Sequence, residues 1–347
     1  MNPFTCPTFS QDEELITLSH GSGGKLTSQL IEEIFLPSFY NSSLASLHDG
    51  AQVSLEAKEI VVTTDSFVIQ PLFFPGGDIG SLSITGTIND LAMCGAKPCF
   101  FTVAMIIEEG FLKSDLKKIV LSMQNIAKKH QIQIIAGDTK VIERKSGNNL
   151  FINTTGIGQL HSPQTVHPSN IEPGDTILLS GDIGRHGMAV MAEREGFSFT
   201  EPLLSDCGSL YPPVKAMLDA GIHIHCMRDL TRGGLATALV ELSESCQKDF
   251  IIQMDTIKVH PSVQSACDLL GIDPFYVANE GRFIIILPCS EVKKALSILQ
   301  AFDIAEGSHI LGTVKTPSSF PCVVAINAYG IQRPLFKLSF EQLPRIC

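Results

Sequence analysis

The chain has 347 residues, which is more than one hydrophobic core usually supports, so its length predicts two domains. A content of 44% hydrophobic and 18% charged residues is typical of a globular protein. The net charge of −11 excludes a partner held mainly through phosphate contacts, so we expect no nucleic acid. No apolar run approaches the roughly 20 residues that cross a bilayer, which predicts no membrane and a cytoplasmic location.

The first 50 residues (1–50) predict an arm, because they are polar and rich in glycine, with one amphipathic stretch around 26–36. Over 51–160, apolar runs typical of strands alternate with segments of helical period, which predicts an α/β domain. Its expected strands are 59–64, 99–107, 131–136 and 151–160, and its expected helices are 78–93 and 114–130.

Residues 161–173 contain three prolines and little apolar periodicity, as expected of a linker. A second α/β domain is predicted over 174–333, and a mobile tail over 334–347. The expected strands of the second domain are 176–180, 283–287, 309–314 and 322–326, and its expected helices are 185–195, 232–245 and 292–301.

Carboxylates occur where the predicted strands end. Asp65 follows the first strand, Asp138 follows the third, Asp90 lies in the first helix, and Asp49 is a fourth candidate. Ligands of α/β sheets lie at strand ends, and converging carboxylates need a cation between them. Oxygen ligands suit Mg²⁺ on nucleotide phosphates, so we expect an ATP site with these four acids as metal ligands. Taken singly, each acid is equally explained as a solvated surface residue or a helix cap.

A glycine-rich segment, RDLTRGG at 228–234, precedes an apolar helical run, with Thr231 as the expected N-cap. Free backbone N–H groups and Arg232 would then face phosphate, although an ordinary capped helix start explains the same pattern. The other nucleotide contacts that we expect stand beside the acids or in this segment: Asn89, Gly137, Thr139 and Gly233.

Three other patterns are weaker. The segment HGSGGKL at 20–26 is not a P-loop, because leucine follows the lysine; a cover over a nucleotide and a loop without function both stay open. GIG at 156–158 lacks the third glycine of a dinucleotide site, which excludes NAD. His223, His225 and Cys226 favour a histidine-bearing strand face at an interface, with a metal site as the alternative.

The chain ends in LPRIC, so the last residue, Cys347, carries a thiol. A terminal segment can be mobile enough to reach a pocket, and Arg345 can stabilise a thiolate there. Such a tail can serve as a tethered nucleophile. An incidental terminal cysteine is the alternative.

These motifs together resemble one family. The similar stretches are LSHGSGGKLTSQLI, TTDSFVIQPLFFPGGDIGSLSITGTINDLAMCGAKP, AGDTKVIER, FINTTGIG, PGDTILLSG, RDLTRGGLA, ANEGRF and the terminal PRIC. They resemble the HypE family of carbamoyl dehydratases, which belongs to the aminoimidazole-ribonucleotide-synthetase-like (PurM-like) superfamily. The resemblance spans essentially the whole chain. It implies two PurM-like α/β domains, the first of which binds ATP.

The resemblance also implies a reaction. A carbamoyltransferase, HypF, loads Cys347 with a carboxamide, and ATP-dependent dehydration converts this group to a thiocyanate. The cyanide then reaches the iron of [NiFe] hydrogenase through the HypC–HypD iron-carrier complex. Glu280 would be the base that collects the amide protons, and Lys140 would polarise the carboxamide oxygen or contact phosphate. A homodimer with the nucleotide near its interface is implied as well.

Two other functions stay open. A selenophosphate-synthetase-like enzyme would phosphorylate a free small molecule, but it would carry a reactive cysteine or selenocysteine in the glycine-rich arm, and 21–25 has none. A non-catalytic scaffold would present its tail to assembly partners, but it would not need so many acids placed for magnesium.

Overall fold

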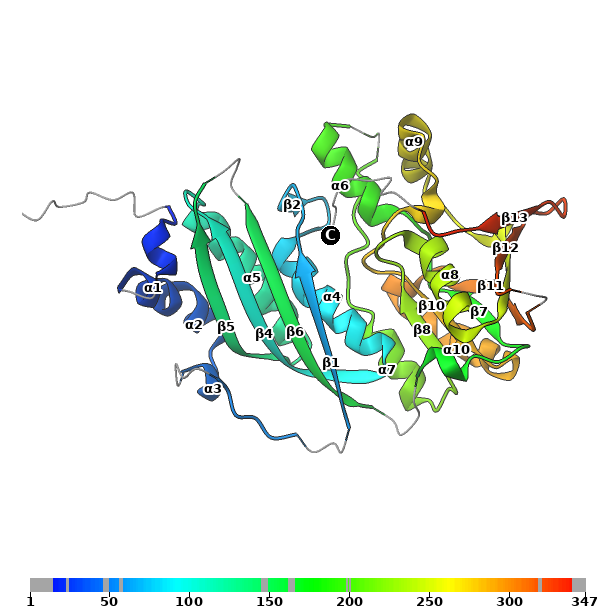
Figure 1. Ribbon diagram of the computed structural model, residues 1–347, viewed down its shortest axis with the longest axis horizontal. Helices are drawn as coiled ribbons and strands as arrows, with labels where there is room; N and C mark the ends of the chain where they lie inside the picture. Colours follow the sequence, from blue (N-terminus) through cyan, green and yellow to red (C-terminus); the bar gives the residue numbers. More distant parts are fainter. Residues whose placement is uncertain are drawn as a thin grey trace, which may run out of the picture.

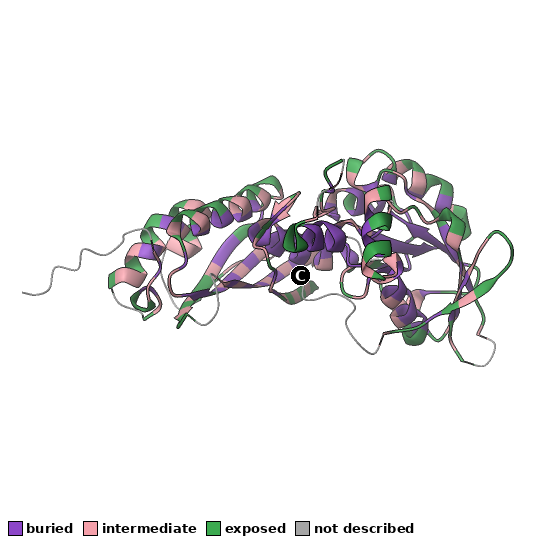
Figure 2. Ribbon diagram, turned by 90° about the horizontal axis from the view of Figure 1, so that it is seen from above, coloured by how far each residue is buried: buried purple, intermediate pink, exposed green. Residues whose placement is uncertain are grey.

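The computed structural model describes residues 15–22, 25–45, 50–55, 59–144, 149–161, 166–197, 199, 201–317 and 320–338. Two predicted site residues, Asp49 and Cys347, lie outside these ranges. The described chain forms two units, each a sheet covered by helices, that lie side by side (Figure 1). Buried residues lie within each unit and at the junction between them (Figure 2).

The N-terminal unit is built on a four-stranded sheet of order β1-β6-β4-β5. Its strands are β1 (Ile60–Phe67), β4 (Ala96–Glu108), β5 (Gln133–Ile142) and β6 (Leu150–Leu160). β6 pairs antiparallel with both β1 and β4, whereas β4 and β5 are parallel. Helices α4 (Ile79–Met93) and α5 (Lys113–Lys129) cover one face, and the opposite face is open (Figure 1). Because side chains alternate along a strand, each strand divides its residues between these two faces.

Helix α4 is the central helix of the molecule. Asp78 caps its start: the Asp78 carboxylate accepts from the Ser81 N–H at 2.9 Å, and the Ser81 hydroxyl accepts from the Asp78 N–H at 2.9 Å. This reciprocal capping box satisfies backbone donors that have no partner within the helix. All residues of α4 are buried except Ser81 and Asp90, because the helix contacts both its own sheet and the C-terminal unit.

The predicted arm is partly helical. Its helices are η1 (Leu18–Gly21), α1 (Lys25–Leu30), the π-helical η2 (Ile31–Phe35), α2 (Leu36–Phe39) and α3 (Ser42–Ala45). Leu30 and Ile34 are buried four residues apart, so the amphipathic stretch predicted around 26–36 is confirmed. A short hairpin follows β1, formed by β2 (Phe73–Phe74) and β3 (Gly77–Asp78).

The C-terminal unit is built on a seven-stranded sheet of order β13-β12-β9-β11-β7-β10-β8. All its pairings are antiparallel except the one between β9 and β12. Its strands are β7 (Thr176–Leu179), β8 (Cys226–Asp229), β9 (Asp249–Gln253), β10 (Phe283–Leu287), β11 (His309–Lys315), β12 (Val323–Ile326) and β13 (Gln332–Leu335).

Five α-helices pack in and around this sheet: α6 (Arg185–Glu195), α7 (Tyr211–Asp219), α8 (Gly234–Cys246), α9 (Pro261–Leu270) and α10 (Val292–Leu299). The single turns are η3 (Pro168–Asn170), η4 (Met254–Thr256), η5 (Pro274–Tyr276), η6 (Cys289–Glu291) and η7 (Asp303–Ala305). None of the helices in the described ranges is both long and apolar enough to span a membrane.

The predicted fold class of two α/β domains is confirmed, and each strand and helix predicted within them is present. The strands and α-helices of these domains that the sequence did not predict are β2, β3, α7, β8, β9, α9 and β13. β13 ends at Leu335, which is buried, so the sheet includes two residues of the segment predicted as a tail.

Candidate active site

Asp65 and Asp138 lie within strands, which corrects the expectation that both follow strand ends. β1 and β5 each continue past these residues. Asp65 pairs with Thr154 of β6, whose hydroxyl bonds to Thr87 of α4. Paired residues project to the same side of a sheet, so Asp65 faces the helices.

Asp138 faces the other way. It pairs with Ala104, which pairs with Asn153, which in turn pairs with Ser66, the neighbour of Asp65. Successive residues of a strand point to opposite faces, so Asp138 belongs to the open face. Three strand spacings, about 14 Å, also separate β5 from β1. The predicted convergence of Asp65 and Asp138 within one chain is therefore wrong.

On the helix side of the sheet lies what we call the inner acid cluster: Asp65, Asp90 and Asp229. The Thr63 hydroxyl donates to the Asp90 carboxylate at 2.8 Å, which ties α4 to β1. Burial raises the pKa of Asp65, and burial together with the nearby Asp65 raises the pKa of Asp90. The positive charge of Arg232 partly offsets both increases in pKa, so this arginine lies within electrostatic range of the cluster. The grouping of Asp65, Asp90 and Arg232 as a nucleotide site stays a prediction.

Asp229, at the end of β8, is a site residue that the sequence analysis missed. Burial raises its pKa to about 7, and the neighbouring Asp90 contributes to this increase. β8 contacts α4, which brings a carboxylate of the C-terminal unit to those of the N-terminal unit. The sequence signal for Asp229 was its position in the RDLTRGG segment. The arginines of this segment led to its interpretation as an anion-binding site.

Glu280 lies in the bend that precedes β10, and only 4% of it is exposed. No residue in the described ranges donates a hydrogen bond to its carboxylate. Burial raises its pKa well above the ordinary value, and the charges of Asp229, Asp206, Asp65 and Asp90 add to this effect in that order. A buried carboxylate with a raised pKa is a stronger base than an exposed one and suits proton abstraction.

Asn89 does not join the cluster beside it. Its side chain is buried at 1% exposure, and it bonds to backbone groups of the C-terminal unit. The Asn89 amide donates to the Gly208 and Glu280 carbonyls at 3.1 and 3.3 Å, and its oxygen accepts from the Leu210 N–H at 2.8 Å. These bonds occupy the groups that were predicted to contact nucleotide.

The glycine-rich segment leads into helix α8, which has 13 residues and begins at Gly234. Gly233 is the N-cap, with a φ of 71°, and not Thr231 as predicted. A side chain at Gly234 would meet the Val277 carbonyl at 2.6 Å, which explains why the turn needs glycine there. Arg232 is exposed beside this helix start, so the arrangement keeps backbone donors and a cation available for an anion.

The open face carries Asp138 and Lys140. Their side chains are 65% and 63% exposed, and the Lys140 ammonium lies 3.8 Å from the Asp138 carboxylate. Gly137 and Thr139 alternate with them along β5, so the Thr139 side chain projects toward the helix side, opposite to Asp138 and Lys140. The glycine-rich arm reaches this strand, because a side chain at Gly21 would meet the Val141 backbone nitrogen at 2.3 Å.

Among the described residues, no three His, Cys, Asp or Glu side chains are grouped as a metal site. Asp65 and Asp90 nevertheless offer carboxylate oxygens in one place, and Mg²⁺ is commonly held by one or two carboxylates plus substrate phosphates. The donor set therefore fits a magnesium–nucleotide complex better than a free ion. Both His223 and His225 precede β8, so the expected histidine-bearing strand face is not present, and His225 is buried and bonds to Asp175 at 2.7 Å.

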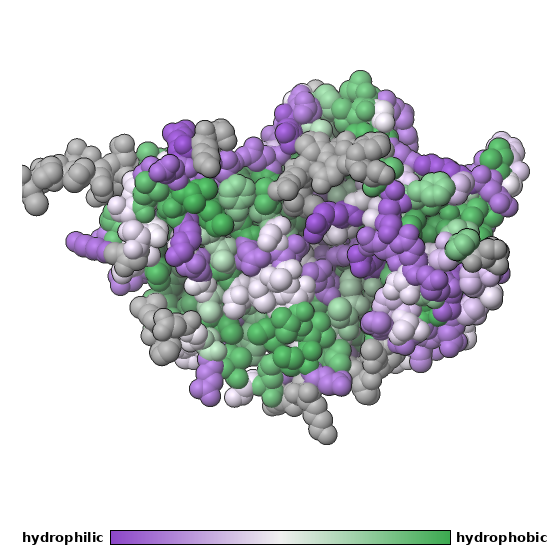
Figure 3. All heavy atoms as spheres, viewed as in Figure 1, coloured by the Kyte–Doolittle hydropathy of each residue, from purple (hydrophilic) through white to green (hydrophobic). Residues whose placement is uncertain are grey.

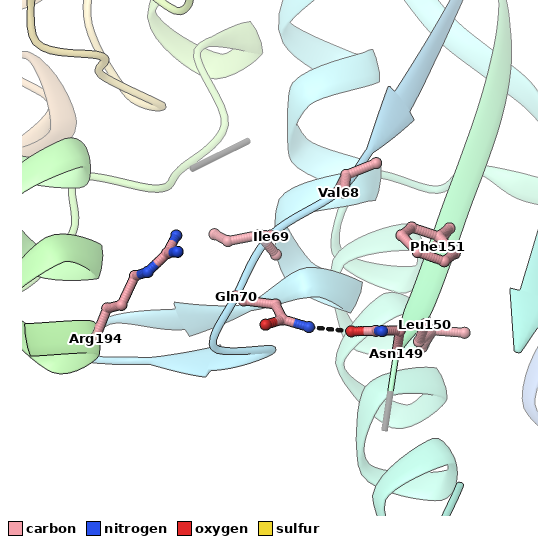
Figure 4. A pocket seen from close by; sticks show the side chains of 7 residues that line it. All are labelled: Val68, Ile69, Gln70, Asn149, Leu150, Phe151 and Arg194. Atoms are coloured by element: carbon pink, nitrogen blue, oxygen red, sulfur yellow. Dashed lines mark hydrogen bonds between the residues drawn. The ribbon is translucent and has the colours of Figure 1, made fainter. Parts of the chain in front are cut away.

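A pocket of about 330 Å³ lies between the units, away from the predicted site residues. Arg194 reaches toward it from α6, opposite Ile69 and Gln70, and Gln70 bonds to Asn149 (Figure 4). The rest of its lining is apolar: Val68, Leu150 and Phe151. None of the acids discussed above lines this pocket.

The fold and its site define a two-domain enzyme of the AIR synthase related class. Residues 47–160 match the N-terminal domain of AIR synthase related proteins, and residues 172–320 match the C-terminal domain. The carbamoyl dehydratase HypE of Azotobacter vinelandii is 43% identical over 332 residues, which cover 96% of this chain and 97% of the relative.

Solved structures of HypE proteins have the same fold. A hydrogenase maturation protein HypE in complex with ATP has a TM-score of 0.92 and 39% identity, covering 95% of this chain and 99% of that one. A HypE from a HypE–HypF complex has a TM-score of 0.77 and 43% identity, covering 89% and 99%. The chain belongs to the HypE family of carbamoyl dehydratases of hydrogenase maturation. The predicted family, fold and enzyme class are confirmed.

Proposed function

We propose that this protein uses ATP to dehydrate a carbamoyl group carried on Cys347, converting the thiocarbamate to a thiocyanate. One observation carries the proposal: Glu280, a buried carboxylate with no described hydrogen-bond donor and a raised pKa, stands within electrostatic range of the inner acid cluster. A base and a phosphate-binding region are thus close together. The ATP complex of a relative with 39% identity supports the nucleotide.

The chemistry requires both parts of the site. The carboxamide oxygen attacks the γ-phosphorus of ATP while one N–H proton leaves, which yields an O-phosphorylated imidate and ADP. Removal of the second N–H proton then forms the third C–N bond, and the C–O bond breaks with its electron pair leaving on phosphate. The sum is loss of one water from the carboxamide. Phosphorylation is needed because an amide oxygen is a poor leaving group.

Asp65 and Asp90 would hold magnesium on the nucleotide phosphates, with Asp49 as a further candidate outside the described residues. Bound there, the ion would offset the negative charge of the phosphate oxygens. Arg232 and the N-terminus of α8 would face phosphate oxygens from the C-terminal unit. Glu280 would take the amide protons, because its raised pKa makes it an effective acceptor.

The open sheet face supports a homodimer. In β1, Ile60 and Val62 are 50% and 57% exposed on this face. Figure 3 shows hydrophobic side chains gathered over the lower part of the N-terminal sheet. A contiguous apolar patch is typical of an interface. A second copy on this face would approach Asp138 and Lys140, which face away from the inner acid cluster of their own chain. We infer that these two residues complete the site of the partner copy.

Two further partners belong to this proposal. The complex of a relative with HypF supports HypF as the carbamoyltransferase that loads Cys347. The HypC–HypD iron-carrier complex would then receive the nitrile, because a thiocyanate is an intermediate that another protein must consume.

The test is the intact mass of the C-terminal peptide after incubation with HypF, carbamoyl phosphate and ATP. We expect wild-type protein to gain a carbamoyl group and then to lose the mass of one water only when ATP is present. Cys347→Ala should show neither change but should still bind nucleotide. A carbamoyl adduct that persists with ATP would indicate a scaffold, and ATP consumption without any change in the tail would indicate a small-molecule kinase; either result would refute the proposal.

A further inference from the structure

Residues 205–210, here called the interdomain strap, cross from the C-terminal unit to the N-terminal unit beside Glu280. The Ser205 N–H donates to the Pro75 carbonyl of the N-terminal unit at 2.8 Å. At the other end, Asn89 of α4 bonds to Gly208 and Leu210. The strap is therefore anchored at both ends on the unit that carries Asp65 and Asp90.

Asp206, in the middle of the strap, binds the backbone of the proposed base. Its two carboxylate oxygens accept from the N–H groups of Glu280, at 3.3 Å, and of Gly281, at 3.0 Å. Contact is so close that a side chain at Gly281 would lie 1.9 Å from the Asp206 carbonyl oxygen. A carboxylate that accepts two backbone donors fixes the direction of that peptide segment.

The carbonyl of Glu280 also accepts two hydrogen bonds. The Asn89 amide donates to it at 3.3 Å, and the Gly208 N–H donates to it at 3.3 Å. Both backbone polar groups of Glu280 are thus engaged by the strap or by α4, whereas its carboxylate has no described donor. The backbone is fixed and the reactive group is left available.

We propose that Asp206 and Asn89 are positioning residues that hold Glu280 in register with the nucleotide-binding unit. This inference rests on the proposed function, because it assumes that Glu280 is the base. Its physical reason is that α4 also carries Asp90, the residue next to Asn89. One helix therefore sets the base and the phosphate region together. A displacement of about 1 Å at a reacting group can reduce a rate by about 100-fold.

Asp206 also acts through its charge. Among the described residues, the carboxylates of Asp229 in β8, Asp206 in the strap, Asp65 in β1 and Asp90 in α4 each raise the pKa of Glu280. Removing the charge of Asp206 lowers that pKa, so Glu280 would lose its proton at a lower pH. The acidic limb of the rate profile would then move to lower pH, while a weaker and less well-placed base would lower the plateau.

The experiment is a single-turnover measurement of thiocyanate formation from pre-carbamoylated full-length protein at a series of pH values. Asp206→Asn keeps the size of the side chain but places an amide N–H against a backbone N–H. We expect the plateau rate to fall about 10- to 100-fold and the acidic limb to move to lower pH, with unchanged ATP binding and unchanged loading by HypF. Gly281→Ala should lower the plateau without moving the limb, because it displaces the strap and leaves its charge.

The matched control is Asp249→Asn. Asp249 is another buried carboxylate that accepts a backbone N–H, from Cys322 at 3.0 Å, but β11 and β7 separate its strand from β10. This variant should match wild type. Equal rates and pH limbs for Asp206→Asn and wild type would overturn the inference, as would a lower plateau with an unmoved limb. If wild type itself formed no thiocyanate, the proposed function would fail instead.

Discussion

The two faces of the N-terminal sheet carry acids of opposite character. On the helix side, Asp65 and Asp90 are largely buried, and burial raises their pKa values. On the open side, Asp138 lies in solvent beside Lys140. The difference shows that one chain does not gather all its predicted ligands, and that alternation along a strand decides which of them can cooperate. In the proposed homodimer, a second copy would bring Asp138 and Lys140 into use.

The largest effect that we expect comes from the helix side. Asp90→Asn should reduce carbamoyl-dependent ATP turnover by about 100- to 1,000-fold, because it removes a charged ligand from the phosphate region. Phosphate release by carbamoylated protein measures this rate. Asp115→Asn is the control, since Asp115 forms a surface ion pair with Lys118 at 2.9 Å. Normal turnover in Asp90→Asn would remove this residue from the site.

The next prediction tests whether the two faces act in different copies. Asp90→Asn and Asp138→Asn should each be nearly inactive, but an equal mixture should regain about one quarter of wild-type turnover after subunit exchange. Half of the dimers would be mixed, and each would hold one site without a substitution and one with both. The measurement is turnover before and after exchange, with a mixture of Asp90→Asn and wild type as the reference. No recovery despite proven exchange would place both acids in the same chain's site.

The course of the chain was predictable where local signals agreed. Helix α4 has both an apolar pattern and the Asp78 cap, and it was predicted to within a residue. α7 was missed because its start, Tyr211-Pro212-Pro213, has the composition of a loop, although proline is well tolerated in a first helical turn. β8 has four residues, two of them charged, and such a strand is visible only once its partner is known.

The site was harder to predict, because it depends on direction as well as position. Asp65, Asp90, Arg232 and Glu280 could be chosen from motifs. The face on which Asp138 lies could not be predicted. The expected strand ended at residue 136, so the alternation of side chains was not extended to Asp138. Asp206 lies in a segment with no helix or strand, and only tertiary contact with Glu280 reveals its use.

The smallest effect that we expect is on stability. It compares Asp229 of the inner acid cluster with Asp138 of the open face at two pH values. Burial raises the pKa of Asp229 to about 7, so the folded protein keeps a proton that the unfolded chain releases between about pH 4 and 7. Stability should therefore fall as pH rises through this window and level off above pH 7. Asp229→Asn has no such group to ionise, so it should be more stable than wild type at pH 8, by roughly 1–3 kcal/mol, and the gain should shrink toward pH 5.

Thermal melting at pH 5 and pH 8, without nucleotide and in the presence of a chelator, measures this effect. We expect a gain of roughly 1–4 °C at pH 8 for Asp229→Asn. Asp138→Asn should change the melting temperature little, because its side chain is 65% exposed and a surface charge contributes little to stability. A gain of the same size at both pH values, or the same gain in Asp138→Asn, would contradict the contrast between the faces. The contrast depends on desolvation, and desolvation acts only on the charged form of the buried acid.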